Sequence, residues 1–518
     1  MIVRLVSNNR RHRLSSLQER LRALSAVELK GIRRGIEKES LRVRPDAALA
    51  LTPHPTTLGS ALAHPSITTD FSESQLELIT GVHADAASCL DELTRIHQFV
   101  YRAIGDERLW VGSMPCDLPP DETIPIGRYG SSNIGRAKSV YRMGLGHRYG
   151  RRMQTISGIH YNWSMPGLSN DDYFALIRNF RRHSFLLLLL FGASPAVCSS
   201  FVSGREHRLQ PLGADTLHLP DATSLRMGRL GYQSDAQAQL RVSYNSLESY
   251  AASLHDALTR SHQPYETLGI LNPGGEYNQL ATTLLQIENE FYGTIRPKRV
   301  IRPGERPLHA LRERGVEYVE VRCMDLDPFE PVGIGTGTLA FLDVFLLHCL
   351  LANSPPDTPE EIEALARNQH CTAERGRDPG LRLERKGREV AITEWAGELL
   401  GECMPIAAAL DAVHRGHSHS EALAAAASAL DDMGVLPSAR VLESTRKEHS
   451  GSHSGFVMAC SERSRRSVMQ RPFSDETRAE FMHLAKQSMD EQRRIELGES
   501  VPFEEFRRTY LNSRAVPH

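Results

Sequence analysis

GIEKESLRV, residues 35–43, is a strand-like segment that carries two glutamates two positions apart. In a β-strand this spacing puts the carboxylates of Glu37 and Glu39 on the same face, about 6.6 Å apart for a rise of about 3.3 Å per residue. Lys38 lies between them and points to the opposite face. One such segment, taken alone, is more typical of the solvent-facing edge of a sheet than of a functional site.

Four further strand-like segments repeat this placement of polar residues among apolar neighbours. The residues expected on the polar faces are Asp70 and Glu77 in ITTDFSESQLELITG (67–81), Gln154, His160 and Asn162 in MQTISGIHYNWSMP (153–166), Glu288, Glu290 and Tyr292 in LLQIENEFYGTIRPKR (284–299), and Tyr318, Glu320 and Arg322 in GVEYVEVRCMDLDPF (315–329). Alternation sends Glu317 to the face opposite Glu320. Five such segments predict a sheet whose polar face lines a cavity.

A cavity lined by several carboxylates has an electrostatic requirement. Neighbouring carboxylates raise one another's pKa unless cations neutralise them. An oxygen-rich set with one imidazole and no thiolate favours Mg²⁺, with Mn²⁺ as the alternative, over structural zinc. Arg322 shares a face with Glu320, and metal ions together with arginine suit a phosphorylated substrate. The run Arg296, Lys298 and Arg299 adds candidate phosphate contacts, although a solvated run of charge is an equally open interpretation.

Composition and missing motifs exclude several classes of function. The 518-residue chain has 61 Lys and Arg against 63 Asp and Glu, which argues against a dedicated nucleic-acid binder. Its longest apolar run, Phe185–Phe191, is too short to span a membrane. No P-loop or Cys-x-x-Cys pair is present, and GIGTGTLAF (333–341) favours a turn into a helix over a dinucleotide site. Sparse cysteines predict reduced thiols, and without a secretory signal we expect a cytoplasmic protein.

The texture of the sequence changes along the chain and predicts three regions. Residues 1–30 are expected to form an N-terminal helical lead-in, and residues 31–345 a catalytic core that holds all the motifs. Residues 346–518 are expected to form a mainly helical C-terminal region packed on the core. Within this region EHSGSHSGF (448–456) is typical of an exposed loop.

Six segments in this order closely resemble the proteobacterial type of the glutamate–cysteine ligase family. They are GIEKESLRV, ITTDFSESQLELITG, MQTISGIHYNWSMP, LFGASPAVCSSF (190–201), QIENEFYGTIRPKR and GVEYVEVRCMDLDPFEPVGI. Linking phrases such as GDERLW (105–110) and YGSSNIGR (129–136) match as well. The resemblance covers residues 31–345 strongly and fades in the last third of the chain.

The resemblance implies an α+β fold with a glutamine-synthetase-like catalytic core. In such a core a curved, mostly antiparallel sheet holds substrates and metals on its concave face and is surrounded by helices. The resemblance also implies ATP-dependent ligation of the L-glutamate γ-carboxylate to the L-cysteine amine through a γ-glutamyl phosphate, which is the first step of glutathione synthesis. It further implies a monomer with small-molecule substrates and feedback inhibition by glutathione.

Carried over position by position, the resemblance assigns roles to individual residues. The implied Mg²⁺ ligands are Glu37, Glu39, Asp70, Glu77, His160 and Glu320. The residues implied to act directly in catalysis are Glu320 and Arg322, with Arg322 facing the transferred phosphate. The implied substrate contacts are Arg226 in ATSLRMGRLGY (222–232) for glutamate, and Tyr141, Tyr232, Tyr292, Gln154 and Asn162 around cysteine. Arg296 and Lys298 are the candidate nucleotide contacts.

Three other readings of the same residues stay open at this point. A related ligase could join glutamate to a different amine. A metal-dependent phosphohydrolase also uses clustered acids with histidine and arginine. A catalytically inactive binding protein would need a broken ligand set, and every acid expected from the motifs is present.

Overall fold

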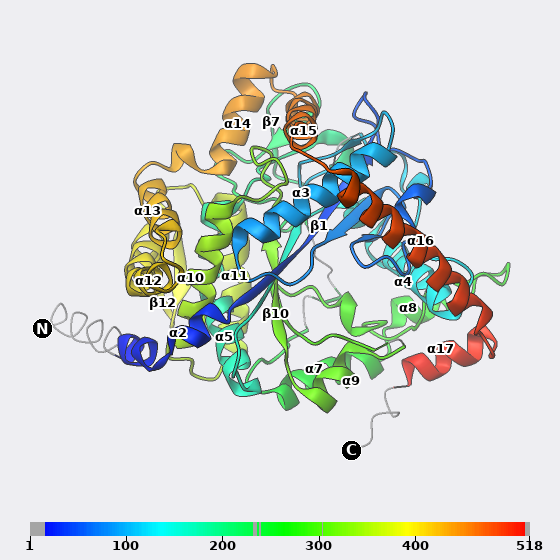
Figure 1. Cartoon of the computed structure of the whole chain (residues 1–518), viewed down its shortest axis with the longest axis horizontal. Coiled ribbons are helices and arrows are strands. Elements are labelled where there is room, and N and C mark those ends of the chain that lie inside the picture. The colour runs from blue at the N-terminus through cyan, green and yellow to red at the C-terminus, as the bar shows by residue number, and fades with distance from the viewer. Residues whose placement is uncertain (1–15, 116, 232–235, 238–239, 303, 513–518) are drawn as a thin grey trace, which may run out of the picture.

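A seven-stranded antiparallel sheet runs through the centre of the described part of the chain (Figure 1). The computed structural model describes residues 16–115, 117–231, 236–237, 240–302 and 304–512. The strand order is β2-β3-β1-β5-β10-β9, and β4 pairs with the far end of β1. The strands are β1 (Arg33–Val43), β2 (Ile67–Thr69), β3 (Gln75–Ile79), β4 (Arg108–Leu109), β5 (Ile159–Ser164), β9 (Ile295–Lys298) and β10 (Tyr318–Met324).

Alternation along these strands separates an apolar face from a polar one. Ile36 of β1, Tyr161 and Trp163 of β5, and Val319 and Val321 of β10 are all fully buried on the apolar face. The acids predicted from the sequence alternate with these residues and therefore lie on the other face. The mixed helical and antiparallel architecture confirms the α+β core expected above.

Helices cover the apolar face of the sheet. α3 (Ala86–Ala103) packs against β1 and β3, α5 (Asn170–His183) against β9 and β10, and α6 (Phe185–Phe191) against β10. α10 (Thr336–Leu351) is apolar on nearly all sides and packs against α3, α5, α12 and α13, which explains its almost complete burial. Its start at Thr336 confirms that GIGTGTLAF turns into a helix.

The remaining elements surround this core. The other helices are α2 (Ala26–Lys30), α4 (Asn133–Tyr149), α7 (Leu247–Thr259), α8 (Gln263–Leu268), α9 (Pro307–Arg314), α11 (Pro359–Arg375), α12 (Ile392–His414), α13 (Ser418–Asp431), α14 (Pro437–Glu448), α15 (His453–Met469), α16 (Asp475–Leu497) and α17 (Phe503–Leu511). Two small sheets join β6 (Ala196–Cys198), β7 (Gln210–Pro211) and β8 (Thr216–His218), and β11 (Arg382–Arg385) and β12 (Arg388–Ala391). Among the described residues no helix is both long and apolar enough to cross a membrane.

The C-terminal helices return to the core beside α4 (Figure 1). The Ser488 hydroxyl of α16 accepts a hydrogen bond from the Ser60 amide at 2.9 Å. Glu499, which follows α16, accepts a hydrogen bond from the Asn133 amide at 2.9 Å, at the first turn of α4. The boundary expected between residues 345 and 346 falls inside α10, so this helix belongs to both regions. The division into three regions otherwise stays a prediction.

Three local expectations need correction. Only residues 449–452 of the segment 448–456 form a turn, because α14 ends at Glu448, α15 begins at His453, and both His453 and Phe456 are buried. Residues Glu288–Glu290 form a 3₁₀ turn rather than a strand, so Glu288, Glu290 and Tyr292 do not share a strand face. Cys198 is disulfide-bonded, so the prediction of reduced thiols is wrong at this residue and holds for the six described cysteines that are free, Cys89, Cys323, Cys349, Cys371, Cys403 and Cys460.

A buried ion pair joins the apolar face of the sheet to α10. Arg34 of β1 lies 2.9 Å from Asp343 of α10, and both side chains are only 3% exposed. The Tyr161 hydroxyl of β5 donates to the same carboxylate at 2.7 Å. Two strands and the central helix are therefore held by one carboxylate.

We expect Asp343→Ala to lower the free energy of unfolding by roughly 3–5 kcal/mol, because it leaves the Arg34 charge buried without its partner. Asp91→Ala is the matched control, since Asp91 forms an exposed pair with Arg95 at 3.1 Å. Loss of that pair should cost no more than about 1 kcal/mol. Denaturant titration followed by circular dichroism measures both values, and equal small losses would contradict the prediction.

Candidate active site

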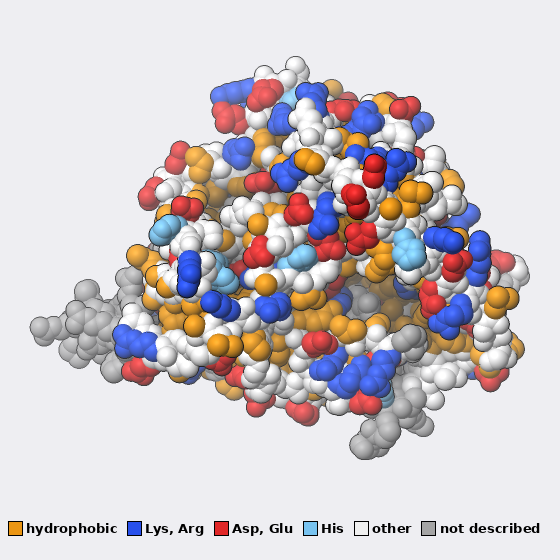
Figure 2. Space-filling model, in the orientation of Figure 1, with side chains coloured by type: hydrophobic (Ala, Val, Ile, Leu, Met, Phe, Trp, Pro, Cys, Tyr) orange, Lys and Arg blue, Asp and Glu red, His pale blue; other side chains and the backbone are white. Residues whose placement is uncertain are grey.

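A cavity of about 770 Å³ opens on the polar face of the sheet. The face shown in Figure 2 is hollowed between the sheet and the side of the molecule that carries α16. Predicted residues that line the cavity are Glu37, Glu39, Asp70, Glu77, Tyr141, Gln154, His160, Arg226, Tyr292, Arg296, Lys298, Glu320 and Arg322. Residues from segments up to 285 positions apart in the chain thus meet in one site.

Strand register brings the acids of the site together. Glu39 on β1 pairs with Glu77 on β3, and Glu37 pairs with His160 on β5. Glu320 on β10 continues the row on the far side of β5. The alternation predicted in these strands therefore places the acids on one continuous surface.

Glu37, His160 and Glu320 form one group that could hold a metal ion. One ligand atom from each lies within 4.8 Å of the others. His160 Nδ1 is 3.1 Å from Glu37 Oε2 and 4.0 Å from Glu320 Oε1. Burial lowers the pKa of His160, which favours the neutral ring that a metal requires.

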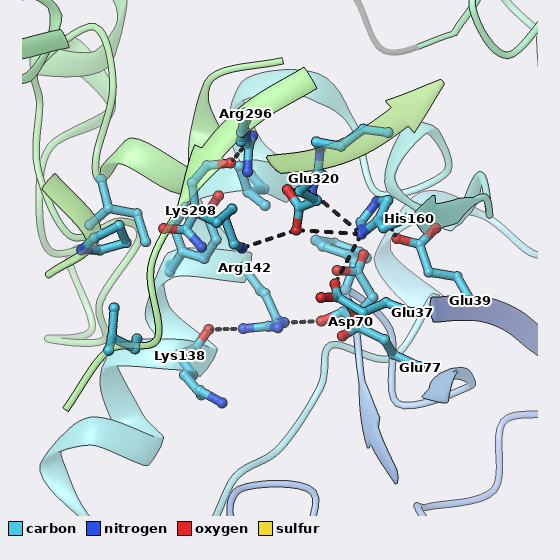
Figure 3. A pocket seen from close by; sticks show the side chains of 18 of the residues that line it. Glu37, Glu39, Asp70, Glu77, Lys138, Arg142, His160, Arg296, Lys298 and Glu320 are labelled. Atoms are coloured by element: carbon cyan, nitrogen blue, oxygen red, sulfur yellow. Dashed lines mark hydrogen bonds and ion pairs between the residues drawn. The ribbon is translucent and has the colours of Figure 1, made fainter. Parts of the chain in front are cut away.

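Glu39, Asp70 and Glu77 form an adjacent acidic group (Figure 3). Burial and the nearby Glu37, Asp70 and Glu39 raise the pKa of Glu77 well above its usual range. Burial, reinforced by Asp70, raises the pKa of Glu39 to about 8. A bound cation would relieve the repulsion that raises the pKa values of Glu39 and Glu77, so the donor chemistry fits hard divalent cations such as Mg²⁺.

Basic side chains occupy the other side of the cavity (Figure 3). Lys298 Nζ donates to Glu320 Oε1 at 3.0 Å, and Arg322 donates to Glu320 Oε2 at 2.9 Å. Burial alone would raise the pKa of Glu320, but Lys298 and Arg322 outweigh it and hold the pKa well below its usual range. Arg296 also lines the cavity, whereas Arg299 donates to the carbonyls of Arg314 and Gly315 and does not.

Aromatic and amide side chains form a further wall. Gln154 Nε2 donates to the Tyr292 hydroxyl at 2.9 Å, and Tyr141 from α4 lies on the same cavity. Gln154 sits in a 3₁₀ turn just before β5 rather than in the strand itself. Asn162 does not line the cavity but donates to Glu37 Oε1 at 2.9 Å, so its contact with substrate stays a prediction. Tyr232 lies outside the described residues.

The two glutamates of the 3₁₀ turn brace the cavity rather than line it. Glu290 is fully buried and pairs with Arg148 of α4 at 2.8 Å. The Tyr149 hydroxyl donates to Glu290 at 2.6 Å, and the Tyr149 ring packs edge-on against Tyr292. Glu288 pairs with Arg306 at 2.7 Å. These ion pairs fix the loop that carries Tyr292.

Sequence reasoning missed three basic residues of the cavity, Arg302 and the pair Lys138 and Arg142. The pair comes from α4, where Lys138, Tyr141, Arg142 and Leu145 all line the cavity. Their spacing of i, i+3, i+4 and i+7 is that of one helix face, which is a signal the sequence contains. It also missed Glu491 and Ile495 of α16 and Tyr510 of α17, which lie in the third of the chain where the motifs fade.

Residues 18–372 match the family model described as glutamate–cysteine ligase. The matched range contains the whole acidic cluster and the basic residues that face it. The chain belongs to the glutamate–cysteine ligase family.

Relatives in the glutamate–cysteine ligase family match this chain over nearly its full length. It is 44% identical to the glutamate–cysteine ligase of Alcanivorax borkumensis over 96% of this chain and 100% of that protein. It is 46% identical to that of Saccharophagus degradans over 94% and 95% of the two chains. The crystal structure of the Francisella tularensis glutamate–cysteine ligase in complex with AMP superimposes with a TM-score of 0.89 at 35% identity, covering 94% of this chain and 98% of that one.

The two acids of GVEYVEVRC provide a direct test of the site. We expect Glu320→Gln to lower kcat by roughly 10²-fold or more, because a charged group at the centre of the cavity is removed. Glu317→Gln is the matched control, since the Glu317 side chain is 47% exposed and pairs with Arg299 away from the cavity. Its kcat should stay within several-fold of wild type. Steady-state kinetics with a thermal melt measures both, and similar losses in the two variants would show that the strand face is misassigned.

Proposed function

We propose that the protein joins the γ-carboxylate of L-glutamate to the amine of L-cysteine at the expense of ATP, the first step of glutathione synthesis. The observation that carries this proposal is the cavity of a glutamate–cysteine ligase family member, in which clustered carboxylates face Lys298, Arg296 and Arg322. Acidic groups on one side and basic groups on the other suit a cation-bound polyphosphate next to a carboxylate that receives a phosphoryl group.

The reaction follows from the low reactivity of a carboxylate toward an amine. The glutamate γ-carboxylate attacks the terminal phosphoryl group of ATP, ADP leaves, and a γ-glutamyl phosphate forms. The cysteine amine then attacks the activated carbonyl, and phosphate leaves as the amide forms. No protein nucleophile is required, and Cys323 is buried on the opposite face of β10 from Arg322. Catalysis rests on positioning and on charge neutralisation.

The metal in this proposal is Mg²⁺, held by Glu37, His160 and Glu320 and by Glu39, Asp70 and Glu77. Its contribution is to neutralise charge on the ATP phosphates. Arg322, Lys298 and Arg296 of the chain act on the same phosphates from the other side. Glu320 pairs with two of these cations, at 2.9 Å from Arg322 and 3.0 Å from Lys298.

The substrate contacts are proposed from the walls of the cavity. Arg226 provides a fixed cation for a glutamate carboxylate. Tyr141, Tyr292 and Gln154 enclose the cysteine, and the Gln154–Tyr292 hydrogen bond of 2.9 Å fixes the orientation of that wall. A largely aromatic pocket distinguishes cysteine from similar amines by its shape rather than by charge.

Regulation and assembly complete the proposal. We propose a monomeric enzyme of the cytoplasm, as the family resemblance implies. Glutathione contains the γ-glutamylcysteine unit of the product, so a cavity that binds glutamate and cysteine side by side also has the contacts to bind glutathione. This chemistry supports feedback inhibition.

We expect Mg²⁺-dependent ADP release that requires both L-glutamate and an amine acceptor, with L-cysteine preferred over L-serine and L-alanine. A coupled assay for ADP, with product mass measured in parallel, tests this. ADP release at the same rate without any amino acid would support a phosphohydrolase instead. Preference for another amine would leave the proposed activation of glutamate standing but would show that cysteine is not the acceptor.

We expect Tyr292→Ala to raise the cysteine KM more than the glutamate KM, because it removes the ring that Gln154 orients toward the cysteine wall. The loss should correspond to about 1–3 kcal/mol, as is typical for one pocket contact. Tyr277→Phe serves as the control, since the Tyr277 hydroxyl bonds to Glu504 at 3.0 Å outside the cavity. An increase in the glutamate KM alone would show that Tyr292 is misassigned.

A further inference from the structure

A buried carboxylate lies directly after β10, behind the wall of the cavity. Asp325 is only 4% exposed, and it does not line the cavity. Its Oδ2 accepts hydrogen bonds from the Ala193 amide at 2.8 Å and the Ser194 hydroxyl at 2.6 Å. Its Oδ1 accepts a hydrogen bond from the Ser224 hydroxyl at 3.0 Å. Three donors from two separate loops thus converge on one side chain.

The guanidinium next to Asp325 is that of Arg226, which does line the cavity. Arg226 Nη1 lies 3.7 Å from Asp325 Oδ1, and Nη2 donates to the Arg322 carbonyl at 2.9 Å. A Cβ added at Gly158 would lie 2.0 Å from Arg226 Nη2, so the guanidinium occupies space that any other residue at position 158 would fill. Arg226 is therefore confined on three sides.

The ion pair between Arg226 and Asp325 is longer than a direct arginine–carboxylate hydrogen bond. Such bonds are about 2.7–2.9 Å long and are often bidentate. The oxygens of Asp325 are already engaged by Ala193, Ser194 and Ser224, so the carboxylate faces Arg226 without a close bidentate contact. Burial raises the pKa of Asp325, while Arg226 and the hydrogen-bond donors oppose that rise. The pairing therefore orients Arg226 through charge rather than through a direct fork.

We propose that Asp325 is a positioning residue that holds the Arg226 guanidinium in the orientation in which it receives a substrate carboxylate. This inference rests on the proposed function, in which that carboxylate belongs to glutamate. It also gives a role to LFGASP and ATSLR, because Ser194 and Ser224 form a β-bridge that brings both segments to Asp325. Asp325 acts through Arg226 and touches no reacting atom.

The test compares Asp325→Asn with Asp327→Asn in the full-length enzyme. Asp327 lies two residues further on, caps the Phe329 amide at 2.9 Å and is outside the cavity, so it is a control for loss of an acid in the same loop. We expect Asp325→Asn to raise the glutamate KM at least tenfold, because the substitution removes the charge that orients Arg226. The cysteine KM should change by less than about threefold, because Asp325 acts only through Arg226. Asp327→Asn should leave both KM values within about twofold of wild type.

A double substitution separates positioning from a purely structural role. The Arg226→Lys variant lacks the planar guanidinium that Asp325 orients. Adding Asp325→Asn to that variant should therefore change the glutamate KM by no more than about twofold. If Asp325→Asn does not fold, as judged by a thermal melt, Ser224→Ala replaces it. That variant removes the one hydrogen bond to Asp325 Oδ1 and should raise the glutamate KM about two- to tenfold.

The outcomes distinguish this inference from the proposed function. A wild-type enzyme whose ADP release does not depend on glutamate overturns both. Glutamate-dependent turnover in the wild type, together with an unchanged glutamate KM in Asp325→Asn or Ser224→Ala, overturns the inference alone. Fully multiplicative effects of Asp325→Asn and Arg226→Lys on the glutamate KM also overturn it, because they would show that Asp325 does not act through Arg226.

Discussion

The repulsion among carboxylates on one face of the central sheet is the constraint to which the rest of the site responds. Register places Glu39 opposite Glu77 and Glu37 opposite His160, with no freedom to separate them once the sheet is formed. Burial then raises the pKa values of Glu39 and Glu77, whereas Lys298 and Arg322 keep Glu320 ionised. The sheet carries a charge distribution that a bound cation stabilises and that an apolar ligand could not satisfy.

The opposite face of the same sheet supplies the rigidity that holds these charges in place. Strand alternation gives several of the cavity residues an apolar neighbour on the back, such as Val321 beside Glu320 and Tyr161 beside His160, and both of these neighbours are fully buried. The Asp343 carboxylate of α10 binds Arg34 and the Tyr161 hydroxyl, so β1 and β5 are fixed relative to each other behind Glu37 and His160. A slip of one residue in either strand would bury acids and expose the apolar set.

Strand alternation could be predicted from the sequence, and long-range pairing could not. GIEKESLRV and GVEYVEVRC give the correct faces because their period is local. The same reasoning failed at Glu288 and Glu290, where a 3₁₀ turn replaces the expected strand. Arg148, which is distant in the chain, pairs with Glu290, and Arg306, which follows the segment, pairs with Glu288. Segment 448–456 was misread because Ser, His and Gly are typical of loops, yet here His453 begins a buried helix. Lys138 and Arg142 were missed although their helical spacing was visible.

Charge separation across the cavity gives the proposed reaction a direction. Glu37, Glu39, Asp70 and Glu77 come from β1, β3 and the turn between β2 and β3, whereas Lys298 and Arg296 come from β9, and Arg322 and Glu320 from β10 (Figure 3). The two sets meet at Glu320 and His160 in the middle of the sheet, which is where the proposed reaction would place a cation-bound polyphosphate. Arg226 enters the cavity from a different loop, where Asp325 and the Arg322 carbonyl hold its guanidinium. The order of strands across the sheet therefore sets the order of charges along the cavity.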